Sequence, residues 1–254
     1  MKIFKKILSF VFVIFIFSGS SQTAYCKVIT KVIEAQTKDT SVMKATVSYT
    51  QITGVTKYPT VLLLHSLGYS SKDWGPLIND LNNAGYAVIA MDLRGHGKSV
   101  FNGKLQQKGW AYFTPATYKK FPNDVVTLLK QAEQIKLLDL NNMAIVGADI
   151  GANTAILAAK EMKKKPKTMV LISPTTTLKG LYVSVALTEL DMPILTMAST
   201  KDRYSSQEQL KLAKFSQGGF YAKNYPNGGM GMIMIKVNPT MSQDITKWII
   251  KYLK

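Results

Sequence analysis

Apolar residues along the chain alternate between short runs rich in β-forming residues and longer stretches with helical spacing. Short apolar runs flanked by turn residues predict strands, and apolar residues every three or four positions predict helices. Because the two patterns alternate, we expect an α/β fold with a mostly parallel sheet covered by helices on both faces. The predicted strands span residues 45–52, 60–66, 86–93, 143–148, 168–173, 193–199 and 220–226.

Two helices are predicted most clearly between and after these strands. One spans residues 122–138, where the apolar positions follow helical spacing. Another begins near Pro239, because proline suits the first position of a helix. The inner face of this last helix is expected to carry Ile245, Trp248, Ile249 and Leu253.

The first 26 residues have the pattern of a secretory signal. A start with three lysines precedes an apolar run, residues 7–17, and small polar residues follow. This run is shorter than the ~20 residues that a membrane-spanning helix needs. We therefore expect residues 1–26 to be a signal peptide and the protein to be exported to the periplasm or the cell exterior. An uncleaved membrane anchor is the alternative.

Cleavage after Cys26 is the expected processing step. Bulky Tyr25 argues against lipidation of that cysteine. Cys26 is the only cysteine in the chain, so the mature protein would contain no disulfide. Residues 27–254 contain no internal repeat or low-complexity linker, and we expect them to form one domain.

The chain is strongly basic. Its formal net charge is +17, and loss of the three lysines of the signal would lower it to +14. Such a charge suits nucleic acids or anionic surfaces. However, the lysines are scattered, and the one dense run, residues 163–165, has no aromatic residues interleaved. We expect a solvated lysine-rich surface with peripheral attraction to anionic surfaces, no specific nucleic-acid partner, and a monomer.

Four loops that follow predicted strands carry the candidate chemistry. They are HSLG from His65, DLRGHGKS from Asp92, GADIGAN from Gly147 and TKDRYS from Thr200. Open parallel sheets bind their ligands at the carboxyl ends of the strands, where these four loops would meet. The sequence therefore predicts a site at that edge of the sheet.

In this order the four loops resemble those of the α/β-hydrolase family, in particular its small lidless members related to dienelactone hydrolases and serine aminopeptidase-like lipases. The resemblance covers nearly the whole mature chain and implies an α/β-hydrolase fold. About twenty residues separate Pro174 from the strand at Pro193, so no large cap domain is expected there. The family places its nucleophile on a tight GxSxG turn between a strand and a helix. Gly147 and Gly151 preserve that turn, but Asp149 stands where the family has serine.

The resemblance also places the remaining members of a catalytic triad. Met230 stands at the position of the catalytic histidine, and a thioether cannot act as a general base. Asp202 stands at the position of the acid, although it could equally cap the helix that follows it. The oxyanion hole would be formed by the backbone N–H of Ile150 and one N–H from the turn at Ser66 and Leu67.

Two functions follow from this pattern. In the first, the protein is non-catalytic or binds an unidentified small ligand, and the Asp149 carboxylate is favoured by the helix N-terminus and occupies the oxyanion hole. In the second, the protein is an active hydrolase of ester, amide or carbon–halogen bonds. Asp149 would be its nucleophile, as in haloalkane dehalogenases and epoxide hydrolases, and His96 its unconventional base.

His65 and His96 are the only histidines, and neither follows the last strand, where the catalytic histidine belongs. Both are therefore expected to have structural roles. A cation site formed by Asp149 and Asp202 is a weaker third hypothesis, because two carboxylates rarely suffice to hold a metal ion. We expect no metal or other cofactor.

Overall fold

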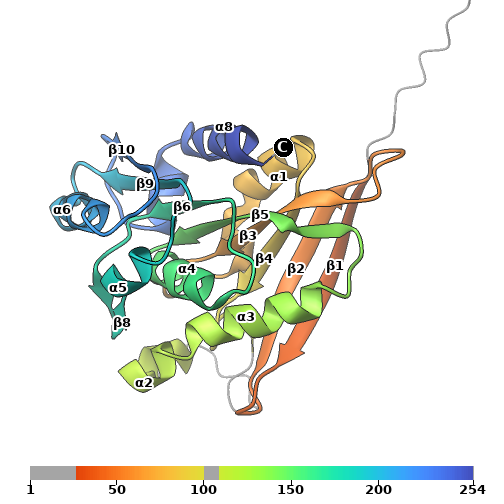
Figure 1. The fold of residues 1–254 in the computed structure, drawn as a ribbon, viewed down its shortest axis with the longest axis horizontal. Coiled ribbons are helices and arrows are strands. Elements are labelled where there is room, and N and C mark those ends of the chain that lie inside the picture. The colour runs from red at the N-terminus through yellow and green to blue at the C-terminus, as the bar shows by residue number, and fades with distance from the viewer. Residues whose placement is uncertain (1–26, 100–108, 254) are drawn as a thin grey trace, which may run out of the picture.

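The structure, a computed structural model, describes residues 27–99 and 109–253 (Figure 1). The predicted signal peptide, residues 1–26, lies outside the described residues, so its prediction stays untested. Among the helices of the described ranges, none has the length and apolar character needed to cross a membrane.

An eight-stranded sheet forms the centre of the fold (Figure 1). Its strand order is β1-β2-β4-β3-β5-β6-β9-β10, and the six strands from β4 to β10 in that order run parallel. Strand β2 runs antiparallel to both of its neighbours, β1 and β4. The predicted α/β class and mostly parallel sheet are thus confirmed. The strands are β1 Val28–Gln36, β2 Val42–Thr50, β3 Tyr58–Leu64, β4 Ala87–Asp92, β5 Leu138–Ala148, β6 Thr168–Ile172, β9 Ile194–Ser199 and β10 Phe220–Tyr225.

Helices cover both faces of this sheet and create two separate apolar cores. Helices α3 and α4 enclose one core, and α1 and α8 enclose the other. Between β6 and β9 the chain forms only the β7–β8 hairpin and the short helix α5. No large cap domain is inserted in this described segment, as predicted. The remaining elements are η1 Ser71–Trp74, α1 Gly75–Asn83, η2 Gly109–Tyr112, α2 Pro115–Tyr118, α3 Phe121–Ala132, α4 Ile150–Glu161, β7 Thr177–Leu178, β8 Leu181–Tyr182, α5 Ser184–Leu187, α6 Arg203–Ala213, α7 Met232–Val237 and α8 Met241–Tyr252.

Both predicted helix boundaries differ from the structure. Helix α3 ends at Ala132, and Leu138 begins β5 by pairing with Tyr58. Apolar residues just after α3 continue its spacing but belong to the turn and the next strand, which periodicity cannot distinguish. The last helix begins at Met241, because Pro239 lies in the turn that ends α7.

Strand β1 was not predicted at all. Only Ile33 and Ala35 of its nine residues are buried, since β1 lies at the edge of the sheet with mostly exposed side chains. The apolar residues of β1 do not alternate strictly with polar ones, so they produce no clear strand pattern.

A buried ion pair fixes the loop after β4 to its surroundings. The Arg94 guanidinium donates to both oxygens of Asp124 on α3, at 2.6 and 2.8 Å, and to Asp39 of the β1–β2 turn at 2.7 Å. Arg94 and Asp124 are almost fully buried. The pairing therefore connects three elements beside the predicted site.

Candidate active site

Asp149 occupies the tight turn between β5 and α4. Its backbone has φ 54° and ψ −116°, a conformation that residues other than glycine rarely adopt. Only glycine fits at the two neighbouring positions. A Cβ on Gly151 would lie 2.1 Å from the carbonyl oxygen of Leu64, and a Cβ on Gly147 would lie 2.5 Å from the carbonyl oxygen of Gly151. The chain thus forms the strained turn that presents a nucleophile, with aspartate at its centre.

The Asp149 carboxylate accepts the hydrogen bonds that the sequence assigned to an oxyanion. Its Oδ2 accepts from the backbone N–H of Leu67 at 3.1 Å, and the backbone N–H of Ile150 also donates to the carboxylate. The residue is 7% exposed. A substrate oxygen could reach these two donors only by displacing the carboxylate.

Burial raises the pKa of Asp149, and the nearby charge of Asp202 raises it further. The N–H donors of Leu67 and Ile150 and the charge of Lys179 act in the opposite direction. The desolvation of the carboxylate is the largest of these effects. The site therefore holds its anion at some cost in free energy.

Asp202 caps helix α6. Its Oδ1 accepts from the backbone N–H of Ser205 at 3.2 Å, and its Oδ2 accepts from the Ser205 hydroxyl at 2.5 Å. The capping role that the sequence left open is thus present in the structure. Asp202 is nevertheless close enough to Asp149 to affect its pKa, so both carboxylates belong to the same edge.

The turn that contains Met230 packs on Asp149 through its backbone. A Cβ on Gly231 would lie 2.1 Å from Ser66 Oγ and 2.9 Å from Asp149 Cβ, so only glycine fits there. The N–H of Met232 donates to Ser66 Oγ at 2.9 Å, which holds the turn against the loop after β3. The side chain of Met230 itself is 43% exposed.

Sequence reasoning missed Ser173, which completes this contact. It follows β6 directly, has φ 52°, and its hydroxyl accepts from the N–H of Gly231 at 2.9 Å. The sequence did contain a signal for Ser173, because a serine that directly follows a buried strand lies at the same carboxyl edge as the other site residues.

Sequence reasoning also missed the β7–β8 hairpin. Asn153 on α4 holds it by donating to the carbonyls of Thr175 and Leu181. The turn of the hairpin contains Lys179, whose charge acts on Asp149. Strands of two residues leave no periodic pattern, so only the Gly180 turn signalled this element.

Both histidines are bound by the backbone through both ring nitrogens. His65 Nε2 accepts from the N–H of Leu93 at 3.0 Å, so its Nδ1–H faces the carbonyl of Ser66 at 2.8 Å. His96 Nε2 accepts from the N–H of Gly68 at 3.1 Å, and its Nδ1–H faces the carbonyl of Arg94 at 2.8 Å.

The same burial keeps the two rings neutral. Burial, followed by the proximity of His65, lowers the pKa of His96 to about 3, and burial also lowers the pKa of His65. Each ring has its one lone pair committed to a backbone donor. Neither histidine can take a proton from water without breaking a buried hydrogen bond.

The cation site considered for Asp149 and Asp202 would need further ligands. Over residues 27–99 and 109–253, no group of three or more His, Cys, Asp or Glu side chains is placed to hold a metal ion.

The sequence model of the family described as serine aminopeptidase, S33, matches residues 57–217. The chain belongs to the S33 family of α/β-hydrolases. The match includes Asp149 and Asp202 and ends before Met230. The predicted resemblance to the α/β-hydrolases is thereby confirmed.

Solved structures agree with this family assignment at the level of the fold. A dienelactone hydrolase from Anabaena variabilis has a TM-score of 0.70 at 15% identity, covering 89% of this chain and 99% of that chain. An acetyl xylan esterase from Paenibacillus has a TM-score of 0.71 at 13% identity, with 90% and 89% covered. An esterase from Pyrococcus furiosus has a TM-score of 0.67 at 18% identity, with 89% and 92% covered. A search of curated protein sequences gives no match.

The buried carboxylate makes the stability of this S33 family member depend on pH. Because the pKa of Asp149 is raised on folding, protonation of this carboxyl stabilises the folded state. That contribution to the free energy of unfolding is fully present below the pKa of an unfolded aspartate and is lost as the pH rises through the folded pKa. Asp149→Asn keeps an acceptor for the N–H of Leu67 and removes this dependence. We expect the variant to gain stability over the wild type as the pH rises from about 4 toward the folded pKa, by about 1.4 kcal/mol for each unit of the pKa shift.

Urea unfolding of both proteins across that pH range measures this difference. Asp191→Asn, an exposed aspartate away from this edge, is the matched control. A difference between Asp149→Asn and wild type that stays constant with pH would contradict the argument.

Proposed function

We propose that this S33 family member is an exported, non-catalytic protein that uses the α/β-hydrolase fold to bind a small ligand at the carboxyl edge of the sheet. The observation that carries the proposal is the state of the histidines. The chain has two, and both are neutral and bound at both ring nitrogens. Hydrolysis by this fold requires a group that takes and returns a proton.

The position of Asp149 supports the same proposal. Its carboxylate occupies the two backbone donors that would stabilise a developing oxyanion. The backbone of Gly231 packs against Asp149, and the residue is only 7% exposed. An ester carbonyl bound here would have to displace an anion from its donors.

The alternative, an active hydrolase with Asp149 as nucleophile and His96 as base, fits this geometry less well. Asp149 would displace the halide of a haloalkane to form an ester, or the alcohol or amine of an ester or amide to form an anhydride, and water activated by a base would have to cleave that intermediate. His96 has its lone pair committed to Gly68, and its pKa of about 3 makes it a very weak base.

The ligand is expected to be uncharged or cationic. Asp149 and Asp202 contribute two carboxylates to this edge, and Asp149 already occupies the available N–H donors. A negatively charged ligand would be repelled and would find no free donor pair there.

Export of the protein rests on the pattern of residues 1–26. We expect protein recovered from outside the cytoplasm to begin at Lys27, and intact-mass measurement checks this. A recovered chain that retains Met1 would favour the uncleaved anchor.

The first test of the proposed function is turnover of a short-chain nitrophenyl ester. We expect the wild type and Asp149→Ala to show the same background rate, because neither has a base. Asp149→Ser combined with Met230→His is expected to hydrolyse the ester, since it restores a nucleophile and a base at the positions that the family uses. Wild-type turnover that is lost in both Asp149→Ala and a folded His96→Gln would establish the active hydrolase instead.

The second test concerns the two backbone donors. Asp149→Gly keeps the required positive φ without strain and frees the N–H groups of Leu67 and Ile150. We expect this variant to bind acetate, with shifts of those two amide resonances in an NMR titration, and the wild type to show none. Equal shifts in both proteins would mean that Asp149 does not fill the hole.

A further inference from the structure

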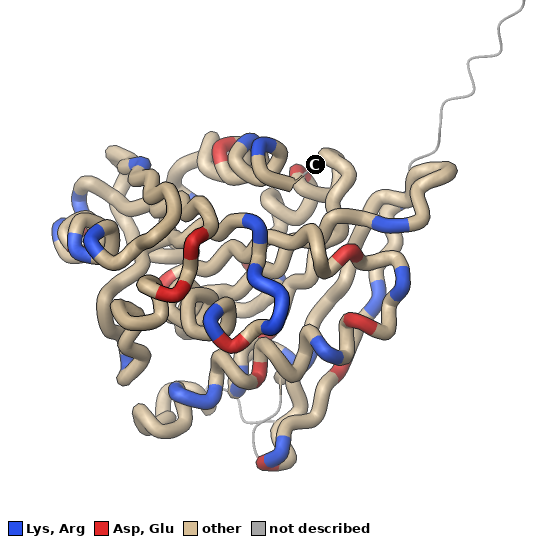
Figure 2. The backbone as a smooth tube through the Cα atoms, viewed as in Figure 1, with Lys and Arg blue, Asp and Glu red and all other residues tan. Residues whose placement is uncertain are grey.

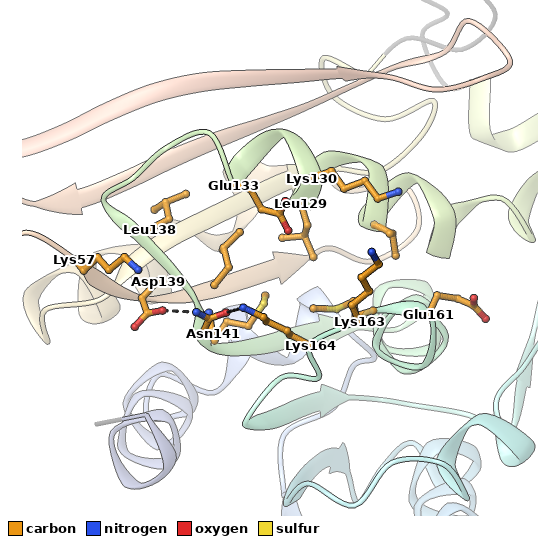
Figure 3. A pocket seen from close by; sticks show the side chains of 14 residues that line it. Lys57, Leu129, Lys130, Glu133, Leu138, Asp139, Asn141, Glu161, Lys163 and Lys164 are labelled. Atoms are coloured by element: carbon orange, nitrogen blue, oxygen red, sulfur yellow. Dashed lines mark hydrogen bonds between the residues drawn. The ribbon is translucent and has the colours of Figure 1, made fainter.

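A hollow of about 370 Å³ lies at the opposite end of the sheet from Asp149. It is bounded by helix α3, the beginning of β5 and the end of α4 (Figure 3). Asp149 lies at the other end of the same strand and helix. The volume is in the range of small-molecule binding sites, roughly 300–1,000 Å³. This hollow is therefore separate from the candidate active site.

An irregularity in β5 forms one wall of the hollow. Asp139 pairs with Pro59 and Met143 pairs with Thr60, so residues 140–142 have no partner on β3. These residues form a bulge, which carries Leu140 and Asn141 to the hollow. Bulges of this kind redirect side chains away from the regular sheet.

The floor of the hollow is apolar. Three of its side chains belong to the core, and three others are only partly buried, two of which, Leu140 and Met162, pack against that core. A chain of methylene groups would cover this exposed apolar surface. The buried floor residues are Leu129, Leu138 and Met143, and the partly buried ones are Val126, Leu140 and Met162.

Lysines surround this apolar floor. Lys57, Lys130, Lys163 and Lys164 line the hollow, and in Figure 3 Lys163 extends from the end of α4 toward α3. Figure 2 shows that the basic run between α4 and β6 forms a continuous stretch on this side. Within the described part of the chain, none of the four lysines forms an ion pair with a carboxylate. The Lys164 ammonium donates to the neutral amide of Asn141.

Three carboxylates also line the hollow and offset part of the positive charge of this rim, but none forms an ion pair with its lysines among the described residues. Asp139 accepts from the backbone N–H of Asn141 at 3.1 Å, and Glu161 points away from the hollow in Figure 3. Glu133 on α3 is the remaining carboxylate. The ammonium groups at the end of α4 are thus available to an anion, while their aliphatic stems extend the apolar wall.

We propose that this hollow binds a single anionic amphiphile, with its aliphatic chain on the apolar floor and its carboxylate or phosphate head group at Lys163 and Lys164. This assignment uses the lysine run that the fold and the candidate active site leave unexplained. It is independent of the function proposed for Asp149.

Isothermal titration with decanoate below its micelle concentration tests the proposal. We expect saturable binding with one ligand per chain. Lys163→Glu combined with Lys164→Glu should weaken it by about tenfold or more, because the head group loses its partners. Val126→Trp, and separately Met162→Trp, should weaken it similarly by filling the hollow, with folding checked by thermal melts.

Matched controls separate this site from general lysine attraction. Lys31→Glu combined with Lys214→Glu changes the net charge equally at exposed positions outside the hollow, and binding should stay within about twofold. Decyl phosphate should bind like decanoate, whereas decanol and decyltrimethylammonium should bind much more weakly.

Several results would overturn the proposal. These are no saturable binding of decanoate, equal binding of decanol, or an equal loss in the control variant. Binding to vesicles of anionic lipid without binding of the single amphiphiles would also overturn it and would indicate a membrane surface as the partner.

Discussion

The close approach of helix α4 to strand β3 determines the geometry of the carboxyl edge. Gly151 lies so near the Leu64 carbonyl that no side chain fits between them, and residue 149 must adopt a positive φ to connect strand and helix. This arrangement aims the N–H groups of Leu67 and Ile150 at whatever side chain stands at position 149. These two backbone N–H groups therefore form an anion-binding site that does not depend on a serine at position 149. With Asp149, the chain supplies the anion itself.

The loops around this turn are held by buried polar groups that resemble catalytic residues in type but not in role. His65 and His96 each form a hydrogen bond with one backbone N–H and one backbone carbonyl. Without the two rings, these backbone groups would be buried without a partner. Arg94 fixes the loop after β4 through Asp124 and Asp39. The edge can thus keep the shape of an α/β-hydrolase site without a proton-transfer residue.

The sequence was sufficient for the parallel strands and for the location of Asp149, because buried strands carry long apolar runs and the glycines of the turn are sterically required. It was not sufficient for β1, which is an exposed edge strand, or for the end of α3, where helical spacing runs on into the next turn. The contacts of Asp149 depend on segments far apart in the chain, such as Ser173 and Gly231. Periodicity reports one segment at a time, so it could not show that the Gly231 backbone packs on Asp149.

The two outermost strands of the sheet have a consequence for how molecules of this protein meet. Lys31 and Glu34 lie on β1, and Lys223 lies on β10, all with exposed side chains. A strand added at either edge would bring charged side chains beside those of the incoming chain and strip water from them. This protects the open edges from the strand-by-strand growth that leads to fibrils. The protection matters for a chain whose single cysteine cannot form an internal disulfide to resist unfolding.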